Sequence, residues 1–225
     1  MNIKLMQHSS LKICAHAIRT CWQSFEKSDD GKEQDKELID RVGNKFKHAS
    51  TLEHLTYTFY ISGVSRALLQ ELSRHRMASL SVKSTRYTLK ELKGESTFTT
   101  GLNSQELLKE YSNPTEVYKD IHMIRASKYL VWTNNLNVDY ASLVALENLR
   151  LLLKDDVSND KAKYCLPESY KTELTWSINA RSLQNFISLR ISKSALWEIQ
   201  DLANFLYEVL PEDHKYLFSN SINKT

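Results

Sequence analysis

The amino-acid sequence predicts an α+β fold, in which helices dominate by length and surround a central, mainly antiparallel sheet. The 225 residues contain only five glycines and three prolines, which favours helices joined by short loops over a sheet protein with many turns. Two segments nevertheless have the alternation and composition of strands. Because this length suits one sizeable core, we expect a single domain over residues 1–225.

The first half of the chain is expected to contain a polar turn, a strand and a helix. The segment 28–36, SDDGKEQDK, has no apolar anchor, so we expect it to be the most flexible stretch. Residues 55–62, LTYTFYIS, alternate and are rich in Thr, Tyr, Phe and Ile, as in a strand, which Gly63 should end. Residues 64–76 then carry apolar side chains at helical spacing and predict a helix.

Three longer helices are expected in the second half. One begins with Asn113 as the cap and Pro114 in the first turn, and should run to about Asn134. Residues 140–154 and 194–210 have similar helical patterns.

A second strand is expected at 174–178, LTWSI, and should enter a helix at Asn179. Large aromatic side chains in and near these elements are assigned to the core instead of to a ligand. They are Tyr57, Phe59, Trp176 and Trp197.

The composition excludes several classes of protein. Hydrophobic residues at 41% and charged residues at 25% are ordinary for a globular chain and wrong for a disordered one. The formal net charge of +3 is too small to indicate nucleic-acid binding by itself. No run approaches the roughly 18 apolar residues that span a bilayer, and the N-terminus lacks the apolar stretch of a signal peptide. We therefore expect a cytoplasmic protein without a membrane partner.

The cysteines and histidines do not suggest a metal site. Cys14, Cys21 and Cys165 are an odd number without CxxC spacing, so neither a disulfide framework nor a zinc site is indicated. We expect each to be a buried or half-buried thiol. The histidines show no ligand spacing, so no metal is predicted.

The densest group of chemistry-bearing side chains lies between Arg74 and Tyr87. Fourteen positions, RHRMASLSVKSTRY, hold four cationic groups, an imidazole and several hydroxyls. Arginine forks bind phosphate oxygens bidentately, and hydroxyls and loop amides can complete the site. The segment therefore predicts an anion site, and the alternative is a solvated basic loop that closes surface ion pairs.

The spacing in this segment resembles the signature of the flavin-dependent thymidylate synthases, the ThyX family. RHR at 74–76 is followed by seven residues, then by Ser84, and then by the pair Arg86 and Tyr87. A match of this length is more specific than a short glycine fingerprint.

Two further segments resemble the family in the same order along the chain. Residues 48–54, HASTLEH, are similar to the segment before its first long strand, and residues 179–190, NARSLQNFISLR, are similar to its second functional helix. The resemblance covers residues 48–190, with adjoining similarity at 195–199.

This resemblance implies an enzyme of the methyltransferase class that makes dTMP from dUMP. Methylenetetrahydrofolate would give the carbon, reduced FAD the hydride, and NADPH would re-reduce the flavin. No cysteine nucleophile would be needed, and none of the three cysteines lies in a suitable context. The family also implies a homotetramer whose active sites are each built from several subunits, with small molecules and not nucleic acid as ligands.

The resemblance assigns residues to both ligands by position. FAD would be held by Ser50, Arg74, His75, Arg76, Asn179, Arg181 and Asn185, with His48 as a candidate for the flavin or folate side and Val82 through its backbone alone. The dUMP set would be Glu71, Arg74, Ser84, Thr85, Arg86, Lys163 and Arg190.

Individual roles follow from the chemistry of these side chains. Arg190 would activate the pyrimidine, because a fixed cation beside N3 and its carbonyl edge stabilises the electron-rich form. Arg86 would anchor the phosphate, and Ser84 is interpreted as a binding hydroxyl because no His-Asp pair can be related to it. In a regular helix Arg181 and Asn185 can share one ligand, whereas Arg190 is expected on about the opposite side.

Three positions depart from the usual family pattern. Glu71 stands where a glutamine is common, and Val82 lies where a side-chain contact to flavin is usual. Lys163 replaces an arginine, which keeps the charge but loses the planar fork. Two alternatives therefore stay open: a non-catalytic nucleic-acid or anion-binding module that uses the Arg74–Arg86 patch, and a family member that binds FAD without making thymidylate.

Overall fold

The computed structural model describes residues 1–99, 101–111 and 113–222. The chain divides into two compact units. The first contains residues 1–62, 70–81 and the chain from 174 onward, and the second contains residues 63–69 and 82–173. The helix-rich α+β class is confirmed.

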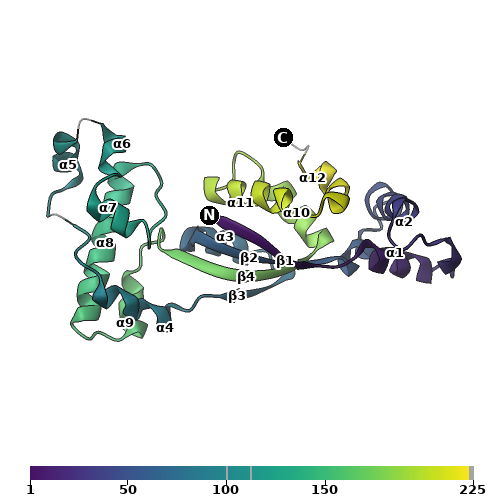
Figure 1. The fold of residues 1–225 in the computed structure, drawn as a ribbon, viewed down its shortest axis with the longest axis horizontal. Helices are drawn as coiled ribbons and strands as arrows, with labels where there is room; N and C mark the ends of the chain where they lie inside the picture. The colour runs from purple at the N-terminus through teal and green to yellow at the C-terminus, as the bar shows by residue number, and fades with distance from the viewer. Residues whose placement is uncertain (100, 112, 223–225) are drawn as a thin grey trace. The chain divides into compact units, whose positions relative to one another are not determined.

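A four-stranded sheet with the order β1-β2-β4-β3 forms the centre of the first unit (Figure 1). Its strands are β1 (Asn2–His8), β2 (Thr56–Ser65), β3 (Ala78–Val82) and β4 (Lys171–Asn179). β1 pairs antiparallel with β2, with Asn2 opposite Ser62 and His8 opposite Tyr57. β2 and β4 also run antiparallel, because Ala180 N donates to Leu55 O at the end of β4 where β2 begins.

Short helices account for most of the remaining chain. Those that lie wholly or partly in the first unit are α1 (Leu11–Thr20), η1 (Phe25–Lys27), α2 (Glu33–Ile39), the π-helix η2 (Asp40–Lys45), η3 (Ala49–His54), α3 (Arg66–Ser73), α10 (Ala180–Arg190), α11 (Trp197–Glu208), η6 (Glu212–Phe218) and α12 (Ser219–Ile222). The second unit contains α4 (Thr85–Thr88), η4 (Leu89–Gly94), α5 (Ser104–Glu110), α6 (Pro114–Val117), α7 (Ile121–Ala126), α8 (Leu136–Lys154), α9 (Asn159–Ala162) and η5 (Lys163–Cys165).

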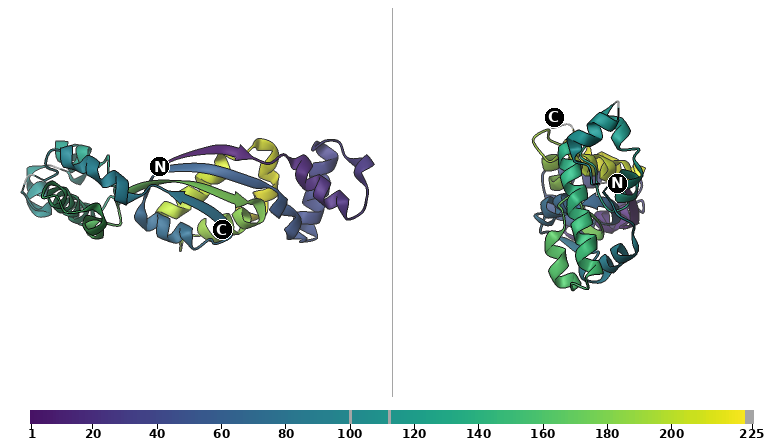
Figure 2. Two further views of the ribbon diagram at one scale, coloured as in Figure 1. Left: turned by 90° about the horizontal axis from the view of Figure 1, so that it is seen from below. Right: turned by 90° about the vertical axis from the view of Figure 1, so that its left-hand side faces the viewer.

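The core of the first unit lies between the sheet and the helices α10 and α11, which lie on one face of the sheet (Figure 2). Alternate residues of β2 point inward, and Tyr57 and Phe59 are fully buried. Trp176 of β4 packs edge-on against Phe186 of α10, with ring centroids 5.1 Å apart. The core assignment is thus confirmed for Tyr57, Phe59 and Trp176, but it is wrong for Trp197, which is 45% exposed at the first position of α11.

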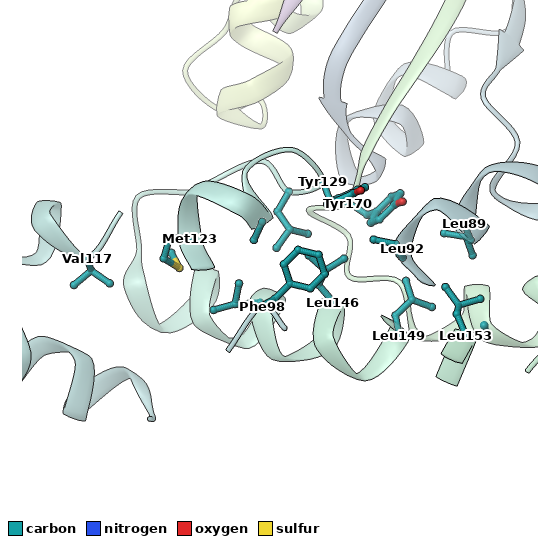
Figure 3. Packing of buried hydrophobic residues seen from close by; sticks show 14 of the residues in the cluster. Leu89, Leu92, Phe98, Val117, Met123, Tyr129, Leu146, Leu149, Leu153 and Tyr170 are labelled. Carbon is teal, nitrogen blue, oxygen red and sulfur yellow. The ribbon is translucent and has the colours of Figure 1, made fainter. Parts of the chain in front are cut away.

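The second unit has its own apolar core, built along α8 (Figure 3). Leu146, Leu149 and Leu153 lie at helical spacing on one face and are buried with Phe98 and other apolar side chains. Glu147 on the same helix is also nearly buried, and it accepts hydrogen bonds from the backbone N–H of Phe98 and from Arg150. This charged pair fastens the loop that carries Phe98 to the helix.

The strand predicted at 55–62 is confirmed, but it does not end at Gly63. Gly63 adopts φ +70°, a left-handed value that a glycine reaches without steric cost, and β2 continues to Ser65. The following helix is therefore shorter than predicted, because it begins at Arg66 and ends at Ser73. The RHR motif at 74–76 directly follows the last residue of this helix, so it begins where the helix stops.

The long helix predicted from Asn113 to about Asn134 is wrong. Asn113 caps α6 as expected, but that helix ends at Val117. The carboxylate of Asp120 then accepts the backbone N–H of His122 at 2.7 Å and starts a second short helix, α7. A capping residue at this point favours a new helix start over continuation.

The other predicted elements of the second half agree better with the structure. The helix predicted at 140–154 begins four residues earlier, at Leu136, because Asn135 caps it. The helix predicted at 194–210 is α11, with both ends shortened. The strand at 174–178 and the helix that starts at Asn179 are confirmed as β4 and α10.

The polar segment 28–36 is held by a buried carboxylate in place of an apolar anchor. Asp35 accepts hydrogen bonds from Arg19 Nε and Nη2, from Ser28 Oγ and from Gly31 N. Burial opposes ionisation of Asp35, but these donors outweigh burial and lower the pKa of the carboxyl below its ordinary value. The last four residues of the segment, 33–36, form the first turn of α2.

The cysteines differ from one another in exposure. Cys14 is buried, and burial raises the pKa of its thiol to about 12. Cys21 and Cys165 are exposed, so the expectation of a buried or half-buried thiol is wrong for both. In the described residues no helix is both long enough and apolar enough to cross a bilayer.

Candidate functional site

A cavity of about 690 Å³ in the first unit collects most of the charged residues that the sequence singled out. Three parts of the chain build it: the segment after α3, the helix η3, and the end of β4 with α10. Its lining residues are Glu53, Arg74, His75, Arg76, Met77, Ile178, Arg181, Ser182, Asn185, Leu189 and Arg190.

The helix α10 presents one polar and one apolar face. Leu183, Phe186 and Ile187 are buried against the sheet, which turns Arg181 and Asn185 toward the cavity. Their predicted sharing of one site is consistent with this lining. The expectation that Arg190 faces away from them is wrong, because Arg190 lines the same cavity. It is the last residue of the helix, and its side chain turns toward α3.

Arg190 is fixed by two neighbours from α3 and the segment after it. Its Nε–H donates to His75 Nε2 at 3.0 Å, and its Nη1–H donates to Glu71 Oε2 at 2.8 Å. Nη2 also donates to the backbone carbonyl of Glu71 at 3.3 Å. The side chain of Arg190 is only 16% exposed. A guanidinium has five N–H groups, so two remain beyond these three contacts.

His75 must be neutral to accept the hydrogen bond from Arg190. Arg190 Nε can only donate, so His75 Nε2 accepts and the ring proton lies on Nδ1. Burial, followed by the positive charges of Arg190 and Arg74, lowers the pKa of His75 below its ordinary value. The ring also packs edge-on against Phe186, with centroids 4.8 Å apart, which holds its orientation. We call Glu71, Arg74, His75 and Arg190 the Arg190 cluster.

The other arginines at this cavity are more accessible. Arg74 is 72% exposed and lies 3.6 Å from Glu71 Oε2, and Arg76 is exposed. Arg181 pairs with Glu53 at 2.7 Å, but both side chains are about half exposed, so the pair is weak and can open. Four arginines thus outnumber two carboxylates, Glu53 and Glu71, and the cavity suits an anionic ligand.

Asn179 has a structural task that the motif did not reveal. Its side-chain oxygen accepts the backbone N–H of Ser182 at 2.9 Å and caps α10. Its amide N–H groups are not used by the cap and can donate to a ligand. Ser50 and His48 are exposed, and Val82 is 38% exposed at the end of β3, but none of the three lines the cavity.

A second charged group lies in the second unit, around Arg86 on the short helix α4. Arg86 Nε donates to Asp160 Oδ1 at 2.7 Å, and Asn159 Nδ2 donates to the carbonyl of Arg86 at 2.6 Å. Both partners belong to α9, which η5 follows directly with the half-buried Lys163. The helix α4 begins with Thr85 after the cap residue Ser84. We call Arg86, Asn159 and Asp160 the Arg86 cluster.

Sequence reasoning gives no role to three residues that contact the predicted arginines. Glu53 lies inside a matched segment without an assignment, whereas Asn159 and Asp160 lie outside every motif. The only sequence feature that points to Asn159 and Asp160 is their closeness to Lys163, which is three residues after Asp160. This feature is too weak to indicate a contact with Arg86. Among the residues that the structure describes, no group of three or more His, Cys, Asp or Glu could hold a metal.

Known proteins match the chain over nearly its whole length. The family model described as "Thymidylate synthase complementing protein" matches residues 4–214. The chain is 65% identical over 218 residues to the flavin-dependent thymidylate synthase of Wolinella succinogenes, with 97% of each chain covered. It is 62% identical over 224 residues to that of Campylobacter jejuni strain RM1221, covering 100% of this chain and 99% of the relative.

A solved structure is also similar in both fold and sequence. It is ThyX from Helicobacter pylori with FAD and dUMP, which superimposes with a TM-score of 0.86 at 53% identity. The match covers 99% of this chain and 100% of the solved one.

Proposed function

This chain belongs to the flavin-dependent thymidylate synthase family, and from that premise we propose that it converts dUMP to dTMP with FAD as cofactor. The observation that carries the proposal is Arg190, a nearly buried cation whose direction is fixed by Glu71 and His75 beside a cationic cavity. The similar ThyX from Helicobacter pylori was solved with FAD and dUMP, which supports the same two ligands here.

The residues of the cavity fit FAD. Arg74, Arg76 and Arg181 can form paired hydrogen bonds to its diphosphate, and Asn185 can meet a polar ring edge. Met77 and Leu189 add apolar surface for a flat ring. We extend the proposed FAD set to Ser50, Asn179 and His48, and to the backbone of Val82, because the family resemblance assigns these positions. When bound, reduced FAD supplies the hydride that completes the new methyl group.

The proposed nucleotide set contains two arginines with different tasks. Arg86, with Ser84, Thr85 and Lys163, would bind the dUMP phosphate, since an exposed guanidinium can exchange its carboxylate partner for a phosphate. Arg190 would direct its two remaining N–H groups at the N3 and carbonyl edge of uracil.

Arg190 would act by electrostatic stabilisation. Attack by uracil C5 needs electron density in the ring, and a positive charge held at the N3 edge lowers the energy of the electron-rich form. Because Glu71 and His75 already fix the guanidinium, little reorganisation is needed when this charge develops. Cys14 is buried with a raised pKa, which makes it unsuited to the nucleophilic role that a cysteine could otherwise take.

The remaining partners follow from the family resemblance. We propose methylenetetrahydrofolate as the carbon donor and NADPH as the reductant of the flavin. We also propose a homotetramer whose active sites are each built from several subunits. The alternative of a non-catalytic nucleic-acid or anion-binding module is not favoured, because the similar proteins are named as enzymes over their full length.

Colour and product formation test the proposal together. The purified protein should show a flavin absorption band, and it should form dTMP from dUMP, NADPH and methylenetetrahydrofolate. A colourless protein that cannot be reconstituted with FAD would overturn the proposal. A yellow protein that makes no dTMP would instead support a family member that has kept the cofactor and lost the reaction.

A further inference from the structure

A second cavity in the first unit, of about 600 Å³, is lined by residues that the proposed FAD and dUMP sets leave almost unused. It lies among α1, α2, the π-helix η2 and the loops that follow them. Trp22 and Phe46 line it, yet they are 82% and 64% exposed. Large exposed aromatic side chains that share one cavity indicate a ligand surface more than a core.

The backbone holds this surface in an unusual conformation. The residue after each aromatic has a left-handed backbone: Gln23 at φ +51° and Lys47 at φ +57°. Phe46 N donates to the carbonyl of Arg41, five residues earlier, which extends the π-type hydrogen bonding of η2. His48 N donates to the carbonyl of Val42 in the same turn. π-helical turns occur frequently at functional sites, and non-glycine residues with a left-handed backbone cluster there.

The charges at this cavity favour an anionic end on its ligand. Arg19 lines the cavity, but the buried Asp35 neutralises it. Arg41 and Lys27 also line the cavity, and in the described part of the chain neither has an acidic side chain within ion-pair distance. The cavity thus combines flat apolar surface with two available cations, and His48, a candidate for the flavin or folate side, lies at its edge.

We propose that this cavity binds the p-aminobenzoyl-glutamate part of the folate co-substrate, an inference that rests on the proposed function. The p-aminobenzoyl ring is flat and can stack on Trp22 or Phe46. The glutamate carries two carboxylates, which Arg41 and Lys27 can bind through charge-assisted hydrogen bonds. A folate with a longer glutamate chain brings more carboxylates and is bound more tightly for the same reason.

The test compares steady-state dTMP formation by the holoenzyme and two variants, Trp22→Ala and Arg41→Ala. Methylenetetrahydrofolate with one and with three glutamates is the varied substrate. Because a charge-assisted hydrogen bond contributes only modestly to binding, Arg41→Ala should raise the folate KM about tenfold. It should also reduce the advantage of the triglutamate, while the dUMP KM and the bound FAD stay within about twofold of the parent enzyme.

Two matched variants control for side-chain type. Lys32→Ala removes an exposed cation of the same region, and Trp197→Ala removes an exposed tryptophan, and neither residue lines the cavity. Both should keep the parent folate KM. An unchanged folate KM in Trp22→Ala and Arg41→Ala would overturn the proposal. A change in the oligomer mass of either variant without a change in its folate KM would also overturn the proposal, because it would identify the cavity as a subunit interface. Failure of the parent protein to form dTMP would instead count against the proposed function.

Discussion

The Arg190 cluster and the Arg86 cluster both pair an arginine with a carboxylate, but they differ in burial and in the number of contacts. Arg190 is 16% exposed and makes hydrogen bonds to Glu71 and to the imidazole of His75. Arg86 and Asp160 are 58% and 62% exposed and share a single ion pair. The same two chemical groups therefore form a fixed element in one place and an exchangeable one in the other.

This difference matches the two tasks proposed for the arginines. An exposed ion pair contributes only about 0–1 kcal/mol, so a phosphate dianion can displace Asp160 from Arg86 at little cost. A cation that must stabilise charge in a transition state works best when its direction is set beforehand. The contacts of Arg190 provide that direction, and those of Arg86 do not.

The largest effect is expected from Arg190→Ala. Loss of a fixed donor at the developing charge should lower kcat by about 10²–10³-fold. The variant also leaves the carboxylate of Glu71 without its closest partner, so the flavin band should be recorded beside the rate to separate lost chemistry from lost cofactor. Arg190→Lys keeps the charge but not the fork, and it should recover only part of the rate. Near-parental single-turnover rates in Arg190→Ala would exclude the role.

The next largest effect is expected from Lys163→Ala, which tests dUMP binding separately from kcat. Lys163 follows α9 and is proposed to hold the nucleotide together with Arg86. Removal of this cation should raise the dUMP KM about tenfold and should change kcat much less. Lys163→Arg is the control and should retain or improve affinity, because it restores a fork. An unchanged nucleotide affinity in Lys163→Ala would count against the assignment.

A smaller effect on the rate is expected when the pH is lowered, and it tests the imidazole of His75 in the Arg190 cluster. The pKa of His75 lies below its ordinary value, so near neutral pH Nε2 is free to accept from Arg190. Protonation as the pH falls through that pKa removes the acceptor, and the rate should decrease on the acid side. The neutral folded form also means that the free energy of unfolding decreases as the pH falls below about 6.5, where the unfolded histidine binds its proton.

Glu71→Gln should shift the acid limb of the pH–rate profile, which is the pH range over which the rate decreases in acid, in a defined direction. The Glu71 carboxylate raises the pKa of His75, so its neutral replacement should lower that pKa and move the limb to lower pH. The amide oxygen of the glutamine can still accept from Arg190, which makes this the conservative substitution. The pH dependence of kcat measures the shift, and a limb that moves to higher pH would refute the assignment.

The smallest effect is expected from Asp160→Asn. The pair with Arg86 is exposed on both sides, so its loss should change the free energy of unfolding by less than about 1 kcal/mol. The dUMP KM should fall slightly or stay the same, because the phosphate no longer competes with a carboxylate. Urea unfolding and nucleotide titration provide the two measurements. A large increase in the dUMP KM would show that Asp160 positions Arg86 instead of competing for it.

Sequence reasoning predicts local elements well and distant contacts poorly. The strand that holds Tyr57 and the helix that starts at Asn179 depend on neighbouring residues, and both are found. The hydrogen bonds of Arg190 join residues 115 and 119 positions apart, and no local pattern indicates them.

The errors have local physical causes. Gly63 does not end the strand, because a glycine adopts a left-handed backbone without steric cost inside an element as readily as in a turn. Asp120 divides the predicted long helix because its side chain caps a new one. The size of Trp197 favours the core, but the first turn of α11 leaves it half exposed. At each of these positions the same residue is compatible with two local structures, and tertiary packing selects one of them.

The buried carboxylate of Asp35 has a consequence for how the N-terminal part of the chain opens. One side chain ties Arg19 at the end of α1 to Ser28 and Gly31 in the following turn, and it belongs to α2 itself. Opening either helix would separate the buried Arg19–Asp35 pair and leave one of the two charges without its partner, at a cost of roughly several kcal/mol. The two helices should therefore exchange their amide hydrogens as one cooperative unit, with a single protection factor that collapses when Asp35 is protonated.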